Sequence, residues 1–312
     1  MYHPYFRGKL NELITIRDNA ALMAARGFVP LIEPVKEGLG GLKRTLDAVV
    51  AAKGKAVVIV NPFHGHFSED GEDISDLLAN SFVAEKGILA GVLLKGDMSV
   101  ADVVACCDGH SDHKLALVHA GFSDAKELVE ALGENTKSMC HVFFEPDCGK
   151  LYQKHFKGAQ RILIRDGFQP RKNREHPQLE LFSDLHATFR DEAMDGFGDF
   201  LIVGDDYSES GGPAYAVAIH LTFIDDDKDE AMYVYHFVSD RQDTPKDPAG
   251  KFGEALRKMI RKLDEPGSKV LESAAVHEFR ELHAQGHFPG LGYIKKLSMQ
   301  HHIETLADYF KA

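Results

Sequence analysis

Eight short apolar runs recur along the first two thirds of the chain, and amphipathic stretches separate them. Each run is apolar nearly throughout rather than at every second residue, as expected of parallel strands whose two faces are both covered by protein. Strands that alternate with helices in this way favour a parallel α/β architecture. The predicted strands are 2–6, 29–33, 56–61, 88–95, 115–119, 139–145, 161–166 and 199–204.

The segments between these strands contain residues that typically begin and end helices. Ser99 and Ser123 stand at N-cap positions, and Gly27, Gly87 and Gly133 stand where helices should end. Eight strands with helices between them fit a closed (β/α)8 TIM-like barrel better than an open doubly wound sheet, which is our second choice. A GxGxxG fingerprint or a GxxxxGK[ST] phosphate loop would favour the open sheet, and the sequence has neither. The predicted helices are 9–25, 40–53, 72–84, 99–107, 123–132, 148–156 and 178–193.

The pattern changes after residue 204. Residues 214–223 and 231–240 alternate apolar and polar side chains on either side of an acidic turn, which predicts an antiparallel β-hairpin. A polar linker then leads to C-terminal helices, one of which can serve as the eighth barrel helix; they are predicted near 250–263, 268–285 and 291–311. We therefore expect a barrel core over 1–212, with the hairpin and helices of 213–312 packed on it as one continuous domain.

Composition narrows the class of protein. The apolar runs are far shorter than the roughly 18 residues that cross a bilayer, and the first residues lack an apolar core of signal-peptide length, so we expect a cytoplasmic protein without membrane partners. Four cysteines form no CxxC pair, which favours reduced thiols. A net charge of −12 argues against general coating of nucleic acid. RKNREH at 171–176 can form a local basic cleft, although such a segment is more often a solvated loop.

Charged and amide side chains follow the predicted strands at their C-terminal ends. The stretch FVPLIEPVK shows the pattern, because Glu33 and Lys36 stand where an apolar strand stops. In a barrel these ends carry the catalytic groups, since eight loops converge there on one cavity. The groups at or just after the strand ends are Arg7, Lys9, Glu33, Lys36, Asn61, His64, His66, Lys95, Asp97, His119, Glu145, Asp147, Arg165, Asp166, Asp205 and Asp206.

Residue types suggest roles within this set. Glu33, His119, Glu145 and Asp166 directly follow apolar strands, and we assign them to catalysis as metal ligands, bases or proton carriers. Asp205, His64 and His66 are the candidate metal ligands; carboxylates suit Mg²⁺ or Mn²⁺, and imidazoles suit Zn²⁺, Mn²⁺ or Fe²⁺. The candidate anion-binding groups are Arg7, Lys9, Lys36, Asn61, Lys95 and Arg165.

Plainer explanations stand beside these assignments. The same charges can form a balanced ring that closes the barrel mouth and needs no ligand. A pair such as His64 and His66, spaced by two residues in a loop, is more often exposed to solvent than bound to metal. Asp97, Asp147 and Asp206 lie beyond the strands proper and fit a structural role better than a catalytic one. Motifs of named hydrolases and kinases, such as GxSxG and HExxH, are absent from the sequence.

The first 40 residues carry a family resemblance. YHPYFRGKLNELITIRD followed by GFVPLIEPVK resembles the N-terminal signature of the phage Beta protein family and its bacterial relatives, and VGDDYS at 203–208 resembles a later aspartate-containing block of that family. VNPFHGH and IRDGF look like a bacterial group often encoded beside a putative restriction-type nuclease. The resemblance implies an anti-phage or mobile-element setting and a nuclease partner, and it supplies no catalytic residues. The matching residues are Pro4, Arg7, Gly8, Lys9, Glu12, Pro30, Ile32, Glu33 and one of Asp205 and Asp206.

Three functions remain open from the sequence. The first is a metal-dependent hydrolase that acts on an anionic, phosphate-bearing substrate or nucleotide at the barrel mouth. The second is a barrel without chemistry of its own that senses a ligand or serves as a scaffold for a nuclease; the hairpin and the C-terminal helices favour it. In the third, the strand-end charges only close the barrel. Alanine at Glu33 or Asp166 separates the first from the third, because it should abolish activity without lowering stability.

Overall fold

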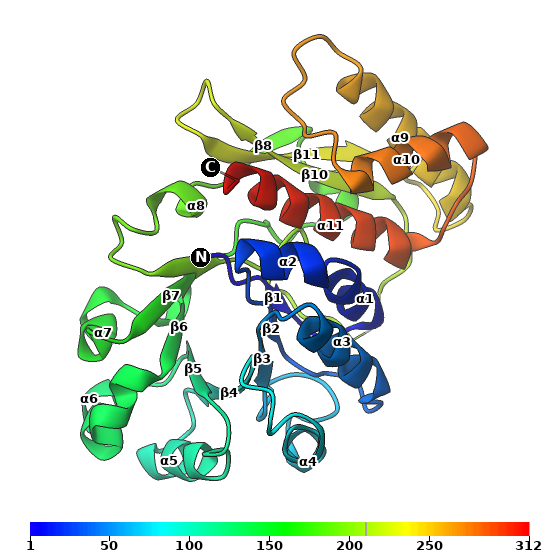
Figure 1. Cartoon of the computed structure of the whole chain (residues 1–312). Helices are drawn as coiled ribbons and strands as arrows, with labels where there is room; N and C mark the ends of the chain where they lie inside the picture. The colour runs from blue at the N-terminus through cyan, green and yellow to red at the C-terminus, as the bar shows by residue number, and fades with distance from the viewer. Residues whose placement is uncertain (210, 312) are drawn as a thin grey trace. The chain divides into compact units, whose positions relative to one another are not determined.

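The structure, a computed structural model that describes residues 1–209 and 211–311, contains a parallel sheet of eight strands surrounded by helices (Figure 1). Its strands follow chain order, and parallel pairing joins Tyr2 near the N-terminus to Phe197 in the last strand. Hydrogen bonds from His3 N to Phe197 O (2.7 Å) and from Tyr5 N to Asp199 O (2.9 Å) nearly close the sheet. The predicted TIM-like α/β barrel is therefore confirmed. The barrel strands are β1 (Tyr5–Phe6), β2 (Leu31–Ile32), β3 (Ala56–Ile59), β4 (Ile88–Lys95), β5 (Leu115–Ala120), β6 (Cys140–Phe144), β7 (Gln160–Ile164) and β9 (Gly196–Gly198).

Helices follow the first six strands, and three of the five predicted end signals are confirmed. The other two are wrong, because Asp124 rather than Ser123 is the N-cap of its helix, and the helix before Gly87 already ends at Ser81. Ser99 forms a capping box with Asp102, and Gly27 ends its helix in the left-handed conformation, both as predicted. The single helix predicted over 9–25 is wrong: it breaks at Asn19, whose side chain donates to the Thr15 carbonyl. The helices are α1 (Leu10–Asp18), α2 (Ala20–Arg26), α3 (Gly40–Ala51), α4 (Glu72–Ser81), α5 (Val100–Asp108), α6 (Ala125–Leu132) and α7 (Lys150–Gln153), with short 3-10 turns η1 (Gly133–Ser138), η2 (Glu145–Asp147) and η3 (Lys154–Phe156).

The last barrel strand is not the one predicted. Residues 199–204 form a turn, closed by a hydrogen bond from Gly204 N to Phe200 O, and the strand is β9 just before them. A Cβ at Gly198 would lie 2.0 Å from the His3 carbonyl oxygen, and one at Gly196 would lie 2.4 Å from that of Met1. The strand therefore requires glycines, which weaken the apolar signal on which the prediction relied.

A second sheet is antiparallel and has three strands, in the order β10–β11–β8. The predicted hairpin is confirmed as β10 (Ala218–Asp225) and β11 (Ala231–Val238). The helix predicted over 178–193 is wrong, because this segment forms β8 (Leu179–Ser183) and the short helix α8 (Leu185–Thr188). Pairing of β8 with β11 overrides the local sequence preference.

By their internal contacts, the described residues divide into two compact units. The barrel unit comprises 1–165 and 188–199, and the second unit comprises 166–187 and 200–312. The second unit thus begins earlier than residue 213, because β8 contributes to its sheet. The three C-terminal helices all belong to it, including the one expected to complete the barrel. They are α9 (Pro248–Leu263), α10 (Ala274–Gln285) and α11 (Leu291–Tyr309).

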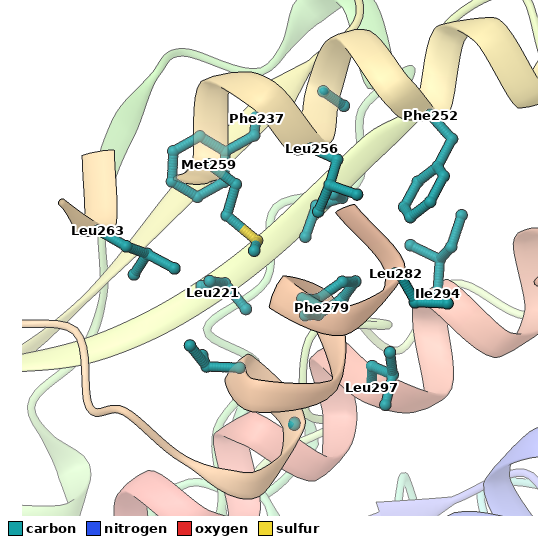
Figure 2. Packing of buried hydrophobic residues seen from close by; sticks show 14 of the residues in the cluster. Leu221, Phe237, Phe252, Leu256, Met259, Leu263, Phe279, Leu282, Ile294 and Leu297 are labelled. Carbon is teal, nitrogen blue, oxygen red and sulfur yellow. The ribbon is translucent and has the colours of Figure 1, made fainter. Parts of the chain in front are cut away.

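The second unit has its own apolar core, built on one face of the hairpin (Figure 2). Leu221 of β10 and Phe237 of β11 lie in one buried cluster with Leu256 and Met259 of α9 and Phe279 of α10. Because side chains alternate along a strand, the even-numbered residues of β10 and β11 point to the opposite face. That face carries two histidines, and the core behind them fixes their backbone. None of the helices in the described chain combines the length and the apolar character that a membrane span requires.

Candidate metal centre

Glu33, which raised the question of function in the sequence, is fully buried at the end of β2. Its Oε2 forms an ion pair with Arg7 and accepts a hydrogen bond from the Tyr5 hydroxyl (3.0 Å). Its Oε1 accepts from the backbone amides of Phe63 (2.8 Å) and His64 (3.0 Å). A carboxylate offers about four lone-pair positions, and these four donors occupy them. The geometry thus gives Glu33 a structural role: it ties β1, β2 and the loop after β3 together.

Other barrel-end groups also bind within the protein. Arg165 makes a two-pronged contact with Glu145, with both N···O distances at 2.7 Å. Asn61 exchanges hydrogen bonds with the backbone of Leu93 (2.9 and 2.8 Å), and the Lys95 ammonium donates to the Pro62 carbonyl (2.9 Å). These contacts join neighbouring strand ends.

Lys9 and Lys36 lie near the start of α1 and the end of β2. Lys9 is the N-cap residue of α1, and Lys36 is exposed and borders a small pocket of about 240 Å³. The pocket is lined mainly by glycines and aliphatic side chains, with Arg44 as its second cation. Nothing in this arrangement assigns either lysine to a particular ligand, so their anion-binding role stays a prediction.

His119 lies inside the barrel unit in a chain of buried polar groups. Its Nδ1 lies 2.6 Å from the Tyr152 hydroxyl, its Nε2 lies 3.0 Å from Nδ1 of His141, and Nε2 of His141 lies 2.9 Å from the Thr136 carbonyl oxygen. Burial lowers the pKa of His119 well below its ordinary value, and the neighbouring His141 lowers it further. Burial likewise lowers the pKa of His141 to about 4. Both rings are thus neutral near pH 7, and the chain ends on backbone.

The remaining predicted residues are divided between the two units. Asp166 begins the second unit, where its two oxygens accept from the amides of Phe168 and Asp205 (both 2.8 Å) and close a turn. His64 and His66 lie in the loop after β3 of the barrel unit, whereas Asp205 belongs to the second unit. Within the described part of the chain, two groups of three metal-ligating side chains occur, and neither contains these three residues.

The first of these groups consists of His176, His220 and His236, all in the second unit, whose ligand atoms lie within 4.8 Å of one another. His220 of β10 and His236 of β11 are directly paired across the hairpin, and their Nδ1 atoms lie 2.7 Å apart. His176 follows the 3-10 turn η4 (Asn173–Glu175), and its ring stacks on that of His236 with centroids 4.3 Å apart. All three side chains are buried. We call them the histidine cluster.

A carboxylate from β8 completes the surroundings of the histidine cluster. Glu180 lies 2.9 Å from Nε2 of His236 and 3.6 Å from Nδ1 of His176, and Arg171 holds it through contacts of 2.8 and 2.7 Å. Both of these ring nitrogens are buried, and each lies beside the Glu180 carboxylate. Glu180 is thus the charged group nearest to both ring nitrogens.

Burial controls the charge of the histidine cluster. It lowers the pKa of His176, holds that of His236 at about 4, and lowers that of His220 well below its usual value. The other two rings lower the pKa of His220 further, because protonated imidazoles would repel one another. Burial raises the pKa of Glu180, but the contacts with Arg171 and His236 outweigh it and hold this pKa below its ordinary value. Near pH 7 the cluster therefore offers three neutral imidazoles beside one carboxylate.

This donor set fits a divalent transition metal. Zn²⁺, Mn²⁺ and Fe²⁺ accept neutral imidazole and carboxylate ligands, whereas Mg²⁺ prefers oxygen alone. The close approach of the three histidines tests the fit, since one ring nitrogen of each lies within 4.8 Å of the others and a single ion can reach all three. Arg171 would hold Glu180 in place from outside the cluster, as outer partners of metal ligands commonly do.

The second group, Asp225, Asp226 and Asp227, lies at the hairpin turn. All three carboxylates contact the ammonium of Lys269, and two of them are exposed. This group is neutralised in part by a cation of the protein itself and shows no buried atom without a partner. It needs no metal to explain it.

A cavity of about 630 Å³ adjoins the histidine cluster, and His220 lines it. Its lining contains four cations and no carboxylate: Arg171, Lys172, Arg174 and Lys295. RKNREH at 171–176 thus forms the local basic cleft considered from the sequence, and it also contributes His176 to the cluster.

Sequence reasoning missed the histidine cluster, although part of its signal was present. The hairpin was predicted, and its register follows from the turn, so pairing Asp225 with Ala231 also places His220 opposite His236. His176 gave no such signal, because its position depends on how the 171–178 segment folds against the hairpin.

Comparison with known proteins adds no relative: neither a protein-family model nor a curated protein matches the chain. Its relation to the phage Beta protein family therefore stays a prediction from the N-terminal motifs.

Proposed function

We propose that the chain is a metal-dependent phosphoester hydrolase whose metal centre is the histidine cluster. The observation that carries the proposal is the presence of three buried imidazoles whose ligand atoms lie within 4.8 Å of one another, with the Glu180 carboxylate beside them. A divalent ion held there would act as a Lewis acid toward a phosphoryl oxygen and make water a better nucleophile near neutral pH. The proposal moves the predicted site from the barrel mouth to the second unit.

Side chains of the second unit would hold the metal ion and bind the substrate. His176, His220 and His236 hold the ion, and Glu180 orients the ring of His236 from the side away from His220. The cations that line the cavity would attract and hold the anionic substrate, because opposite charges lower the cost of removing phosphate from water. Since His220 lines the cavity, a phosphate bound there lies next to the metal ligands.

Metal content and turnover test this proposal together. We expect the purified chain to bind about one Zn²⁺, Mn²⁺ or Fe²⁺ ion, and to hydrolyse phosphomonoesters or phosphodiesters only when loaded. His176→Gln and His220→Gln should each weaken metal binding at least tenfold. His277→Gln, an exposed histidine on α10, is the matched control and should bind metal normally. Mass spectrometry of the metal content and circular dichroism of each variant separate lost binding from lost folding.

Two results would contradict parts of the proposal. If added Zn²⁺, Mn²⁺ and Fe²⁺ neither bind nor raise the melting temperature, the cluster is a buried hydrogen-bonded group and not a metal centre. If metal binds but no phosphoester turns over, the chain fits the alternative function of a ligand-sensing or scaffold partner.

The biological setting is proposed on the N-terminal motifs alone. Their resemblance to the phage Beta protein family supports a role in an anti-phage or mobile-element system of bacteria, with a neighbouring nuclease as partner. The four cysteines, which are free in the structure, agree with a reducing cytoplasm. Co-purification of the tagged chain with the product of an adjacent nuclease gene tests the partnership.

A further inference from the structure

We propose that the cavity beside the histidine cluster binds a nucleoside phosphate, with the phosphate at its cations and the base against Tyr215. The inference deepens the proposed function, on which it rests for the reaction, and its binding step can be tested without metal. The cavity volume of about 630 Å³ lies within the range of small-molecule sites and exceeds what inorganic phosphate needs.

Charge is the first argument. The chain has a net charge of −12, yet the cavity lining contains four cations and no carboxylate. Arg171 is engaged by Glu180, and Arg174 lies 3.9 Å from its neighbour Glu175. Lys172 and Lys295 make no ion pair with any described residue. Like charges gathered in one cavity repel one another, so an anionic ligand would relieve an unfavourable arrangement.

The position of the cations places the phosphate. Lys295 lies in the second turn of α11, and Leu291, the first residue of that helix, also lines the cavity. The positive end of the helix dipole therefore adds to the field of the lysines. His220 lines the same cavity, and its Nε2 has no hydrogen-bond partner within 1–209 and 211–311. A phosphate held by Lys295 would thus lie in the cavity that the histidine cluster borders.

The other walls fit an aromatic base. Tyr215 lines the cavity with 44% of its surface exposed, and its ring stacks on no described aromatic residue. Ile202 and Ile294 add aliphatic surface. An exposed aromatic ring beside a basic groove is the arrangement by which proteins stack the bases of single-stranded nucleic acids.

Asn173 and Lys251 add to the recognition of a base at this wall of the cavity. Asn173 donates its Nδ2 to the Ala216 carbonyl (2.9 Å), which leaves its Oδ1 to accept from an exocyclic amino group of a base. The buried Lys251 donates to the carbonyls of Ala214 (3.1 Å) and Tyr215 (2.7 Å). Lys251 is thus a positioning residue: it fixes the backbone that presents Tyr215 to the cavity.

Binding to the metal-free full chain is the test. We would titrate protein treated with a chelator with nucleoside monophosphates, the matching nucleosides, inorganic phosphate and a 5′-phosphorylated dinucleotide, using calorimetry at two salt concentrations. We expect a nucleoside phosphate to bind at least tenfold more tightly than phosphate or nucleoside, and more weakly at higher salt. The dinucleotide arm distinguishes a free nucleotide from a strand end, which share this chemistry.

Variants assign the binding to the cavity. Lys295→Ala should weaken binding of nucleoside phosphate and inorganic phosphate alike by at least tenfold, and Tyr215→Leu should weaken only the former. Lys246→Ala, an exposed lysine of the same unit, is the control and should change neither. Equal affinity for nucleoside phosphate and inorganic phosphate, or binding that survives both cavity variants, would overturn the inference.

The two proposals fail in different ways. Nucleotide binding in metal-free protein, without turnover after metal loading, would support the inference and remove the hydrolase. Turnover of simple phosphoesters without preference for a nucleoside would keep the hydrolase and overturn the inference.

Discussion

Replacing Glu33 by glutamine tests whether this buried carboxylate at the barrel mouth serves stability or catalysis. The substitution keeps the shape of the side chain but removes its charge and turns one acceptor oxygen into a donor. Arg7 would then be buried beside a neutral group, and one pair of donors that now bind Glu33 would face an NH₂. Breaking a buried ion pair by removing one partner costs about 3–5 kcal/mol. We therefore expect the free energy of unfolding to fall by that amount.

Urea denaturation followed by circular dichroism measures this change. Because the chain has two compact units, two transitions can appear, and only the one that reports the barrel should shift. Glu134→Gln is the matched control, since Glu134 forms an exposed pair with Lys137. Exposed pairs contribute about 0–1 kcal/mol, so this variant should unfold nearly as the wild type does.

Turnover of the same two variants decides the interpretation. If Glu33→Gln unfolds within about 1 kcal/mol of the wild type and loses turnover, Glu33 acts in catalysis, as its place at a strand end first predicted. If stability falls as expected while the folded fraction keeps its turnover, the carboxylate holds the barrel together and the active site lies elsewhere.

Two further predictions concern stability. Since burial keeps the pKa of His119 and His141 below the ordinary value near 6.5, both rings are neutral in the folded state, and only the unfolded chain takes up protons as the pH falls below about 6.5. The stability that depends on these neutral rings is therefore complete above about pH 6.5 and is lost as the pH falls toward 4, by about 3 kcal/mol for His141. An equal free energy of unfolding in urea at pH 7.5 and at pH 4.5 would contradict this prediction. Phe279→Ala removes a fully buried ring from the core of the second unit and should cost about 3–5 kcal/mol, and a loss below about 1 kcal/mol would contradict the packing in Figure 2.

The barrel was predictable because its signal is local. A strand covered on both faces needs mainly apolar residues, and seven of the barrel strands contain a short apolar run. The eighth depends on Gly196 and Gly198, which are set by how closely the first residues of the chain approach them. The prediction of a helix in place of β8 was wrong for a related reason, because pairing with β11 decides the conformation of this segment. In both cases a tertiary contact determines the local structure, and a local pattern does not record it.

The site followed the same rule. Position along a strand correctly indicated where Glu33 and Arg165 would lie, but not that each would meet an oppositely charged partner. That pairing depends on which strand ends are neighbours and how far their side chains reach. The predicted hairpin register was enough to place His220 opposite His236. The position of His176 could not be predicted, because it depends on how a loop folds.

The two candidate sites differ in how far their polar groups are already bound within the protein, and not in how many polar groups they contain. At the barrel mouth, the oxygens of Glu33 and the guanidinium of Arg165 are bound within the protein, so a ligand would have to displace existing contacts. In the second unit, three buried imidazoles lie within 4.8 Å of one another, and Lys295 stands in a cavity whose lining contains no carboxylate. Leaving such groups uncompensated destabilises a folded chain unless a ligand satisfies them. Functional sites are often where a fold departs from local satisfaction, and on that ground we propose the histidine cluster and its basic cavity as the functional site.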